Sequence, residues 1–286
     1  MSQSKSVGIL YICTGKYIAF WKRFHESFQK NFLPDTLKRY YIFTDKPESI
    51  TQSERVKAYY IDSLPWPLGA LMKFHYLMRF REQIINNDYL MLVNANLVCR
   101  EVIHEREFLP NDNQYLSCVI SPGYYNRKAR WSPYERRRQS RAYVPYNIDG
   151  KYVLSGIICG HSDKFIDMSE TISSRINEDL NNRIIALWHD ESHFNRYVLE
   201  NNKSIRYLDP SFAYPEDRDL PFVKKIEILE KSKIFDVNTF KGYTKPKVSL
   251  IKKIINLPAK LFHQLITSRF MRNIFCLRDS LLMRKL

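Results

Sequence analysis

The sequence contains few glycines and no long uninterrupted apolar run. Only 8 of the 286 residues are glycine, which excludes a collagen-like or low-complexity chain. No uncharged stretch reaches the length of about 18 residues that a transmembrane helix needs. The apolar run before Lys16 is too short for a signal peptide. We therefore expect a cytoplasmic protein.

Cysteine is also scarce. The five cysteines are odd in number and widely spaced, and no pair has the spacing of a zinc site or a redox motif. They are Cys13, Cys99, Cys118, Cys159 and Cys276. We expect reduced thiols, most of them buried.

Acidic residues are outnumbered by basic ones, 30 to 45, which gives a formal net charge of +15. Such an excess indicates an anionic partner, either nucleic acid, an acidic membrane surface or a phosphorylated substrate. The hydrophobic fraction of 44% and the aromatic fraction of 14% exclude general disorder. The chain therefore folds, but its charge does not distinguish among the three partners.

The first half of the chain alternates strand-like and helix-like segments. Residues 7–13 and 39–45 read as strands around a helical pattern at 16–32. A second cycle combines a helical pattern at 70–85 with a strand at 89–93. Repeated strand-helix-strand units predict an α/β fold with a mainly parallel central sheet flanked by helices, and binding residues at the carboxyl ends of its strands.

The second half adds a strand at 151–160 and helices at 165–182 and 184–202. Before them, residues 121–145 are rich in Arg, Tyr, Pro and Ser and lack periodicity, which is typical of a functional loop that a ligand orders. Its arginines and aromatic residues suit a nucleic-acid patch or a lid over a diphosphate. Because no nucleic-acid-binding motif accompanies the loop, we favour the second and expect no nucleic-acid partner.

The segment 244–286 is basic and amphipathic and is predicted to be a tail separate from a main domain at 1–243. It packs on the domain as a helical pair or binds an anionic membrane surface peripherally. The second interpretation places the protein on the inner face of the membrane.

The motif "WHDES" spans Trp188 to Ser192. As a helix start, it is explained by capping through Asp190 or Ser192. An aromatic ring beside carboxylates also suits a sugar, which stacks on indole and donates hydroxyls to the carboxylates. A metalloprotease is excluded, because the motif lacks the required order of His and Glu.

The motif Asn94-Ala95-Asn96 follows the strand at 89–93. Two aspartates there would hold Mg²⁺ or Mn²⁺ against a diphosphate. Neutral amides offer one weak oxygen each and no charge. By itself, the motif is better explained as an Asn-rich turn after the strand.

Several separated blocks, in order, resemble glycosyltransferase family 6, which includes the blood-group A and B transferases and the α-1,3-galactosyltransferases. The blocks are "KYIAF", "YYIFTD", "DYLMLVNAN", "SPYERRRQSRAYVP", "YVLSGIICG" and "LWHDESHFNRY". The resemblance covers about residues 7–233. It implies the Asp-x-Asp (GT-A) type of glycosyltransferase fold and a uridine diphosphate sugar donor.

The resemblance also assigns roles by position. The resemblance implies that the uridine contacts Ile12, Cys13, Thr14 and Tyr17. It also implies that the diphosphate lies near Lys73 and Lys231. The other positions implied for the donor are Asn94, Ala95, Asn96, Leu154, Gly156, His189 and Asp190. Acceptor contacts are implied for Ser121, Gly123, Trp188, Glu191 and Glu216, with Glu191 as the central catalytic carboxylate.

Three positions that line the sugar pocket, Gly123, Leu154 and Gly156, resemble the blood-group A combination. Gly156 leaves space for an N-acetyl group, so UDP-GalNAc is the expected donor and an α-1,2-fucosylated galactoside the expected acceptor. The family's acceptor-contacting His is Ser121 here, and its acceptor-binding Asp aligns with Pro215 beside Glu216. The resemblance is therefore weaker on the acceptor side.

The family retains anomeric configuration, which implies that Glu191 is either a nucleophile or a stabiliser of the transition state. Because Asn-Ala-Asn replaces Asp-x-Asp, we expect a metal-independent enzyme with no Mn²⁺ or Mg²⁺ cofactor. Lys73, Lys231, Lys233 and the arginines at 136–138 would then balance the diphosphate charge. The alternatives are a UDP-Gal-dependent transferase, a binding protein that has lost catalysis, and a basic RNA-binding protein.

Overall fold

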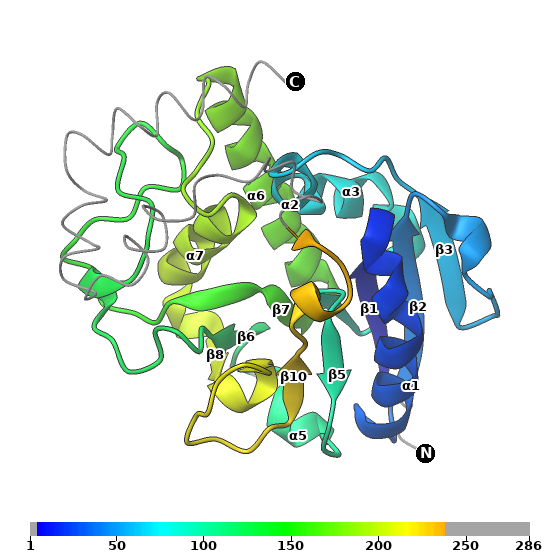
Figure 1. The fold of residues 1–286 in the computed structure, drawn as a ribbon. Helices are drawn as coiled ribbons and strands as arrows, with labels where there is room; N and C mark the ends of the chain where they lie inside the picture. Colours follow the sequence, from blue (N-terminus) through cyan, green and yellow to red (C-terminus); the bar gives the residue numbers. More distant parts are fainter. Residues whose placement is uncertain (1–4, 112, 238–286) are drawn as a thin grey trace.

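The computed structural model describes residues 5–111 and 113–237 (Figure 1). The predicted tail at 244–286 lies outside these residues, as does Cys276. The four cysteines within them are buried and unpaired, as predicted. In the described part of the chain, no helix has the length and apolar character needed to span a membrane.

The central element is a seven-stranded sheet of order β3-β2-β1-β4-β7-β6-β8. Its strands in chain order are β1 (Ser6–Ile12), β2 (Leu37–Thr44), β3 (Val56–Tyr60), β4 (Tyr89–Val93), β6 (Leu116–Ile120), β7 (Val153–His161) and β8 (Ile205–Leu208). The first four are mutually parallel, which confirms the prediction from the repeated strand-helix units. Strand β7 runs antiparallel to both β4 and β6. It therefore begins at the edge of the sheet where β4 ends.

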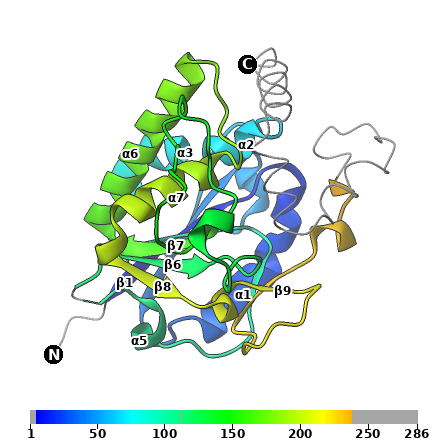
Figure 2. The ribbon, with the colours of Figure 1, turned by 90° about the vertical axis from the view of Figure 1, so that its left-hand side faces the viewer.

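Helices cover both faces of the sheet. They are α1 (Trp21–Asn31), α2 (Leu68–Leu71), α3 (Lys73–Arg79), α4 (Arg81–Ile84), α5 (Glu105–Phe108), α6 (Ser162–Asn181) and α7 (Asp190–Glu200). Short 3-10 turns connect them: η1 (Gly15–Phe20), η2 (Pro47–Ser49), η3 (Ala129–Trp131), η4 (Asn202–Ser204), η5 (Pro210–Ala213) and η6 (Lys231–Lys233). Figure 2 shows α1 and α6 on opposite sides of the sheet.

Successive side chains of the buried strands point to opposite faces of the sheet and contribute to two hydrophobic cores, one on each face. Ile9 and Tyr11 of β1 pack with Phe24 of α1 on one face, whereas Leu10 packs with Phe165 of α6 on the other. Because successive side chains of a strand point to opposite faces, a strand that is apolar throughout serves both layers. This explains why these strands read as continuous apolar runs.

Two predicted helices differ in their bounds. The pattern at 70–85 forms three short helices instead of one, and the break at Phe80 lets its ring pack against Phe43 and Tyr59. The helix expected from residue 184 begins at Asp190. His189 has a φ of 54°, which helical backbone does not adopt, so the helix has to begin after it.

A second, three-stranded sheet follows the Asn-Ala-Asn motif directly. Its strands are β5 (Leu97–Cys99), β10 (Ile226–Ile228) and β9 (Tyr214–Pro215), in the order β5-β10-β9. Strand β5 pairs antiparallel with β10. This sheet attaches the last described part of the chain to the segment that leaves β4.

Candidate active site

The candidate site lies where β1 and β4 end and β7 begins. Val93, the last residue of β4, pairs with Ile157 of β7, so Asn94 lies beside Gly156. The backbone N–H of Asn94 donates to the Gly156 carbonyl at 2.8 Å. The antiparallel direction of β7 thus brings Leu154, Ser155 and Gly156 to the edge at which parallel α/β sheets bind ligands.

The side chain of Asn94 lies directly against Gly156. A Cβ atom on Gly156 would be 2.2 Å from the Asn94 Nδ2 atom, well inside any real contact distance. The close approach therefore requires glycine at 156. The open space that the sequence predicted beside Gly156 is therefore occupied, because the Asn94 side chain fills it. A neutral amide, which both donates and accepts hydrogen bonds, lies at the position implied for donor-sugar contact.

Asn96 is 2% exposed and ties the end of β4 to the last described segment. Its Nδ2 group donates to the Leu229 carbonyl at 2.6 Å, and the Leu229 N–H donates to the Asn96 carbonyl at 2.8 Å. The two bonds extend the β5–β10 ladder by one residue. An aspartate at 96 would place a carboxylate oxygen against the Leu229 carbonyl, so this contact requires a donor.

These residues do not fit Mg²⁺ or Mn²⁺ as a ligand set. Both ions favour carboxylate ligands, and Asn96 leaves a single neutral oxygen, Oδ1, without a hydrogen-bond partner in the described structure. The carboxylates of Asp190 and Glu191 are already bonded to Lys73 and Tyr152. Within residues 5–111 and 113–237, no three His, Cys, Asp or Glu side chains gather as a metal site would need.

Glu191 is fixed by two donors from the start of β7. The Tyr152 hydroxyl donates to its Oε1 at 2.8 Å, and the Ser155 backbone N–H donates to its Oε2 at 3.1 Å. Burial raises the pKa of Glu191 above its ordinary value, whereas the bonds from Tyr152 and Ser155 lower it. The carboxyl is thus held in one orientation at the sheet edge.

Asn195, one turn along α7, fixes the helix that carries Glu191. Its Oδ1 accepts from the Val153 N–H, and its Nδ2 donates to the Val153 carbonyl and to the Glu191 carbonyl. The start of β7 and the first turn of α7 are therefore locked together. The relative position of Ser155 and Glu191 follows from this lock.

Lys73 and Asp190 form a nearly buried ion pair beside Glu191. The Lys73 Nζ lies 2.7 Å from Asp190 Oδ2, with side-chain exposures of 12% and 5%. The same ammonium group donates to the Ser155 carbonyl and hydroxyl, each at 3.3 Å. The structure thus brings together Lys73, Asp190, Glu191 and the β7 residues that the sequence assigned to one site.

The residues before Asp190 have a special backbone. His189 lies in the left-handed region, is 9% exposed, and its ring lies 4.9 Å from that of Trp66. Non-glycine residues with positive φ cost free energy and concentrate at functional sites. Trp188 is 43% exposed, so its indole offers a ring face to a ligand.

The expected uridine-binding residues lie at the end of β1. The side chain of Cys13 is fully buried, and burial raises the pKa of its thiol to about 12. Its backbone N–H and carbonyl bond to Phe43 and Thr44 of β2. Cys13 therefore acts as a support for its neighbours Ile12 and Thr14, which are partly exposed.

Lys231, near the end of the described residues, lies in the same region. Its Nζ lies 5.0 Å from the centre of the Tyr17 ring, and Phe235 packs edge-on against that ring at 5.3 Å. The bonds between Asn96 and Leu229 hold the segment that leads into η6. The structure thus places a cation beside the residues implied for the uridine.

Ser121 and Gly123 lie on the side of Glu191 away from Tyr17. The Ser121 N–H donates to the Tyr152 carbonyl, and a Cβ atom on Gly123 would be 3.8 Å from a guanidinium nitrogen of Arg218. Glu216 is engaged within the protein, because it accepts from Lys233 Nζ and from the Glu230 N–H. The Lys233 ammonium group is therefore engaged by Glu216 and not by the residues implied for the diphosphate.

Two of the loop arginines also have internal partners. Arg136 donates to the carbonyls of Val144 and Pro145. Arg137 pairs with Glu135, which is 2% exposed and also accepts from the Leu187 N–H just before the "WHDES" motif. Arg136 and Arg137 therefore anchor the loop, whereas Arg138 is exposed. Lys73 lies beside Asp190 and Ser155, and Lys231 lies beside Tyr17.

Sequence reasoning missed four residues of this site: Tyr152, Ser155, Asn195 and Trp66. Asn195 lies four residues after Glu191 on a helix, a spacing that puts both on one face. Tyr152 and Ser155 carry no such signal. Their role depends on the direction of β7, which the pattern of apolar residues does not reveal.

We predict that Asn96→Asp destabilises the protein by about 2–4 kcal/mol at pH 7, because a buried carboxylate would face a carbonyl without a donor. Burial would raise the pKa of the new carboxyl in the folded state, so the loss is present above its unfolded pKa and shrinks as the pH falls toward about 4. Urea unfolding at pH 7 and pH 5 measures this difference.

Asn182→Asp is the matched control. Exposed Asn182 also donates to a backbone carbonyl, that of Glu178. Because water solvates the new charge, we expect a loss below about 1 kcal/mol at both pH values. Equal losses in the two variants would contradict the structural role of Asn96.

Comparison with known proteins agrees with this geometry. Residues 1–238 match the model of glycosyltransferase family 6. The O-antigen biosynthesis glycosyltransferase WbnI of Escherichia coli is 31% identical over 211 residues, 73% of this chain and 88% of that protein.

Two animal relatives are similar over less of their length. Histo-blood group ABO system transferase 2 of Rattus norvegicus is 26% identical over 75% of this chain and 65% of its own length. Globoside alpha-1,3-N-acetylgalactosaminyltransferase 1 of Homo sapiens is 26% identical over 76% of this chain and 63% of its own length. The chain thus spans somewhat less than two thirds of these relatives. The α/β architecture is consistent with a GT-A-type fold, and the chain belongs to glycosyltransferase family 6.

Proposed function

We propose that this protein is a retaining α-1,3-N-acetylgalactosaminyltransferase that moves GalNAc from UDP-GalNAc to the galactose of an α-1,2-fucosylated acceptor. The observation that carries the proposal is the fixed carboxyl of Glu191, held by Tyr152 and Ser155 between the donor and acceptor residues. A binding protein that had lost catalysis would have no need of this arrangement. The relatives include a globoside α-1,3-N-acetylgalactosaminyltransferase.

The contact between Asn94 and Gly156 supports GalNAc as the donor sugar. The Asn94 amide lies where a side chain on Gly156 would begin. An amide can donate a hydrogen bond to the carbonyl of the N-acetyl group of GalNAc or accept one from its N–H group. A methyl group at 156 would displace that amide. UDP-Gal, which lacks the N-acetyl group, gains nothing from this contact.

In the proposed reaction, the bond between the anomeric carbon and the β-phosphate oxygen breaks, and its electron pair leaves with UDP. The acceptor hydroxyl forms the new bond on the same face and transfers its proton to the departing phosphate. Glu191 acts from the opposite face, either by forming a transient bond or by stabilising the oxocarbenium-like transition state. Both routes need the ionised carboxylate. Burial raises the pKa of Glu191, and the bonds from Tyr152 and Ser155 oppose that rise.

We propose further that lysines take the place of a metal at the diphosphate. Lys73 lies between Asp190 and Ser155, and Lys231 lies at the Tyr17 ring. Preorganised cations of this kind stabilise the charge that develops on a leaving group. Neither Mn²⁺ nor Mg²⁺ is then required.

The donor assignment predicts that the wild-type protein transfers GalNAc at least about tenfold more efficiently than Gal to a fucosylated galactoside. Gly156→Ala should lower kcat/KM for UDP-GalNAc more than for UDP-Gal, because the new methyl displaces Asn94. UDP release measured with each donor tests both statements. A wild-type preference for UDP-Gal would replace the donor assignment with the galactosyltransferase alternative.

The catalytic assignment predicts that Glu191→Gln reduces transfer by at least about 10²-fold, the lower end of what a positioned carboxylate contributes. Calorimetry should show unchanged UDP binding. Glu200→Gln, at the far end of α7 where Glu200 pairs with Arg196, is the control and should transfer normally. Normal transfer by Glu191→Gln would show that another residue is central.

A further inference from the structure

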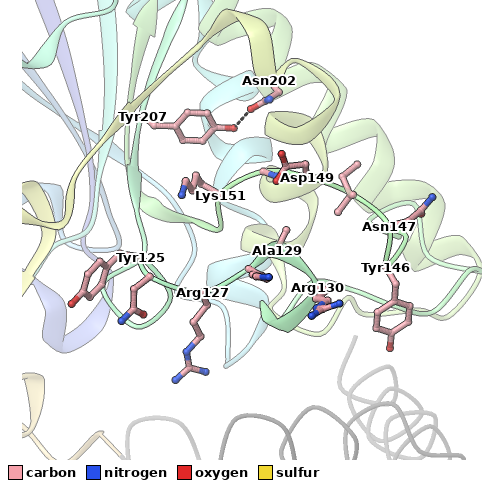
Figure 3. Close-up of a pocket in the computed structure, with 14 residues that line it drawn as sticks. Tyr125, Arg127, Ala129, Arg130, Tyr146, Asn147, Asp149, Lys151, Asn202 and Tyr207 are labelled. Carbon is pink, nitrogen blue, oxygen red and sulfur yellow. Dashed lines mark hydrogen bonds between the residues drawn. The ribbon is translucent and has the colours of Figure 1, made fainter.

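A second hollow lies outside the site described above. Residues 125–130 and 146–151 form its walls together with Asn202 and Tyr207, and its volume is about 850 Å³. Figure 3 shows Lys151 and Tyr207 on one side of the hollow and Arg130 and Tyr146 on the other. Ligand pockets for small molecules have volumes of about 300–1,000 Å³, so this hollow has room for more than one sugar ring.

The lining is strongly cationic. It contains Arg127, Lys128, Arg130 and Lys151 but a single acid, Asp149. All four basic residues are exposed, and within residues 5–111 and 113–237 none of them pairs with a carboxylate. Elsewhere in the protein, basic side chains such as Arg137 and Lys225 do pair with carboxylates. The four charges therefore remain available to an anion.

The rest of the lining suits a carbohydrate. Tyrosine side chains at 125 and 207 line the hollow, and the asparagine side chains at 126 and 147 carry both donors and acceptors. The Tyr146 ring stacks under the Arg136 guanidinium group at 4.4 Å, and the Asn202 side-chain oxygen accepts from the Tyr207 hydroxyl. Aromatic rings and amides together provide the apolar and polar contacts that a sugar makes with its two faces and its edge. The hollow thus combines an anion-binding character with a sugar-binding one.

Two tyrosines in contact with each other lie between the lining of the hollow and the Glu191 carboxyl. Lys151 in its lining directly precedes Tyr152, whose hydroxyl donates to Glu191. The Tyr152 ring packs on that of Tyr124 at 5.2 Å, and Arg127 lies over the Tyr124 ring at 5.1 Å. Because Tyr124 follows Gly123, the hollow adjoins the segment that carries residues implied for the acceptor.

We propose that this hollow binds the reducing-end portion of the acceptor, and that this portion carries an anionic group, either a phosphate or a carboxylate. This inference rests on the proposed function, because it places the acceptor galactose at Glu191 and the remainder of the glycan in the hollow. The guanidinium groups of Arg127 and Arg130 match the two oxygens that both anions present. The natural acceptor is therefore a charged glycan.

The test compares three acceptors that share the α-1,2-fucosylated galactose. Their reducing ends carry a methyl glycoside, a phosphate or a uronic acid. We expect kcat/KM for at least one charged acceptor to exceed that for the methyl glycoside about tenfold, because charge-assisted hydrogen bonds are roughly twice as strong as neutral ones. The advantage should fall as NaCl is raised from about 0.05 M to about 0.5 M, since salt screens exposed charges. The phosphate and uronic acid arms identify which anion is bound.

The double variant Arg127→Gln with Arg130→Gln, which removes both guanidinium groups, should remove most of the preference for the charged acceptor. Lys57→Gln, on the exposed face of β3 far from the hollow, is the control and should keep the wild-type preference. Equal kcat/KM values for all three acceptors in the wild-type protein would overturn the inference while leaving the proposed function intact. A preference that survives the double variant would also overturn it.

Binding provides a readout that does not depend on turnover. With UDP present to fill the donor site, calorimetry should show tighter binding of the charged glycan than of its methyl glycoside, and the double variant should abolish the difference. If no acceptor receives a sugar but this difference is observed, the proposed function fails, and what stands is that the hollow binds the anionic part of a glycan. If the charged and neutral glycans bind equally, the inference fails.

Discussion

The paired hydrogen bonds between Asn96 and Leu229 are the contact on which the site depends. They join the end of β4 to the segment after β10, 133 residues later in the chain. Through that segment they place Lys231 at the Tyr17 ring, beside the end of β1. A carboxylate at 96 would lose the donor that makes this contact. Asn96, at the position where the family resemblance implies a metal-binding aspartate, thus makes the contact that places Lys231 beside Tyr17.

The direction of β7 is the second constraint. Because β7 is antiparallel to β4, its first residues lie at the ligand-binding edge, where Ser155 donates to Glu191 and Gly156 receives the Asn94 amide. Asn195 then fixes α7 against Val153. The Glu191 carboxyl is therefore held by a side-chain donor just before β7 and a backbone donor within it, a rigid arrangement of the kind that preorganised sites use.

Much of this could be read from the sequence. The parallel strands β1, β2 and β4 follow from their apolar runs and the helices between them. The donor residues expected at 73, 94, 156 and 190 and the catalytic carboxylate expected at 191 do gather at one edge. The bonds of Glu191 could not be read, because Tyr152 and Ser155 become neighbours of α7 only through the reversed direction of β7. The break at Phe80 was hidden too, since it depends on the aromatic packing of Phe43 and Tyr59. Local patterns predict elements, whereas contacts between distant segments decide which side chains are free to act.

We propose that lysines at fixed positions replace a divalent cation. The most direct test is the rate of GalNAc transfer from UDP-GalNAc to a fucosylated galactoside, measured with protein treated with excess EDTA, before and after addition of Mn²⁺. We expect full activity in EDTA and little gain from Mn²⁺. Loss of transfer in EDTA that Mn²⁺ restores would contradict it.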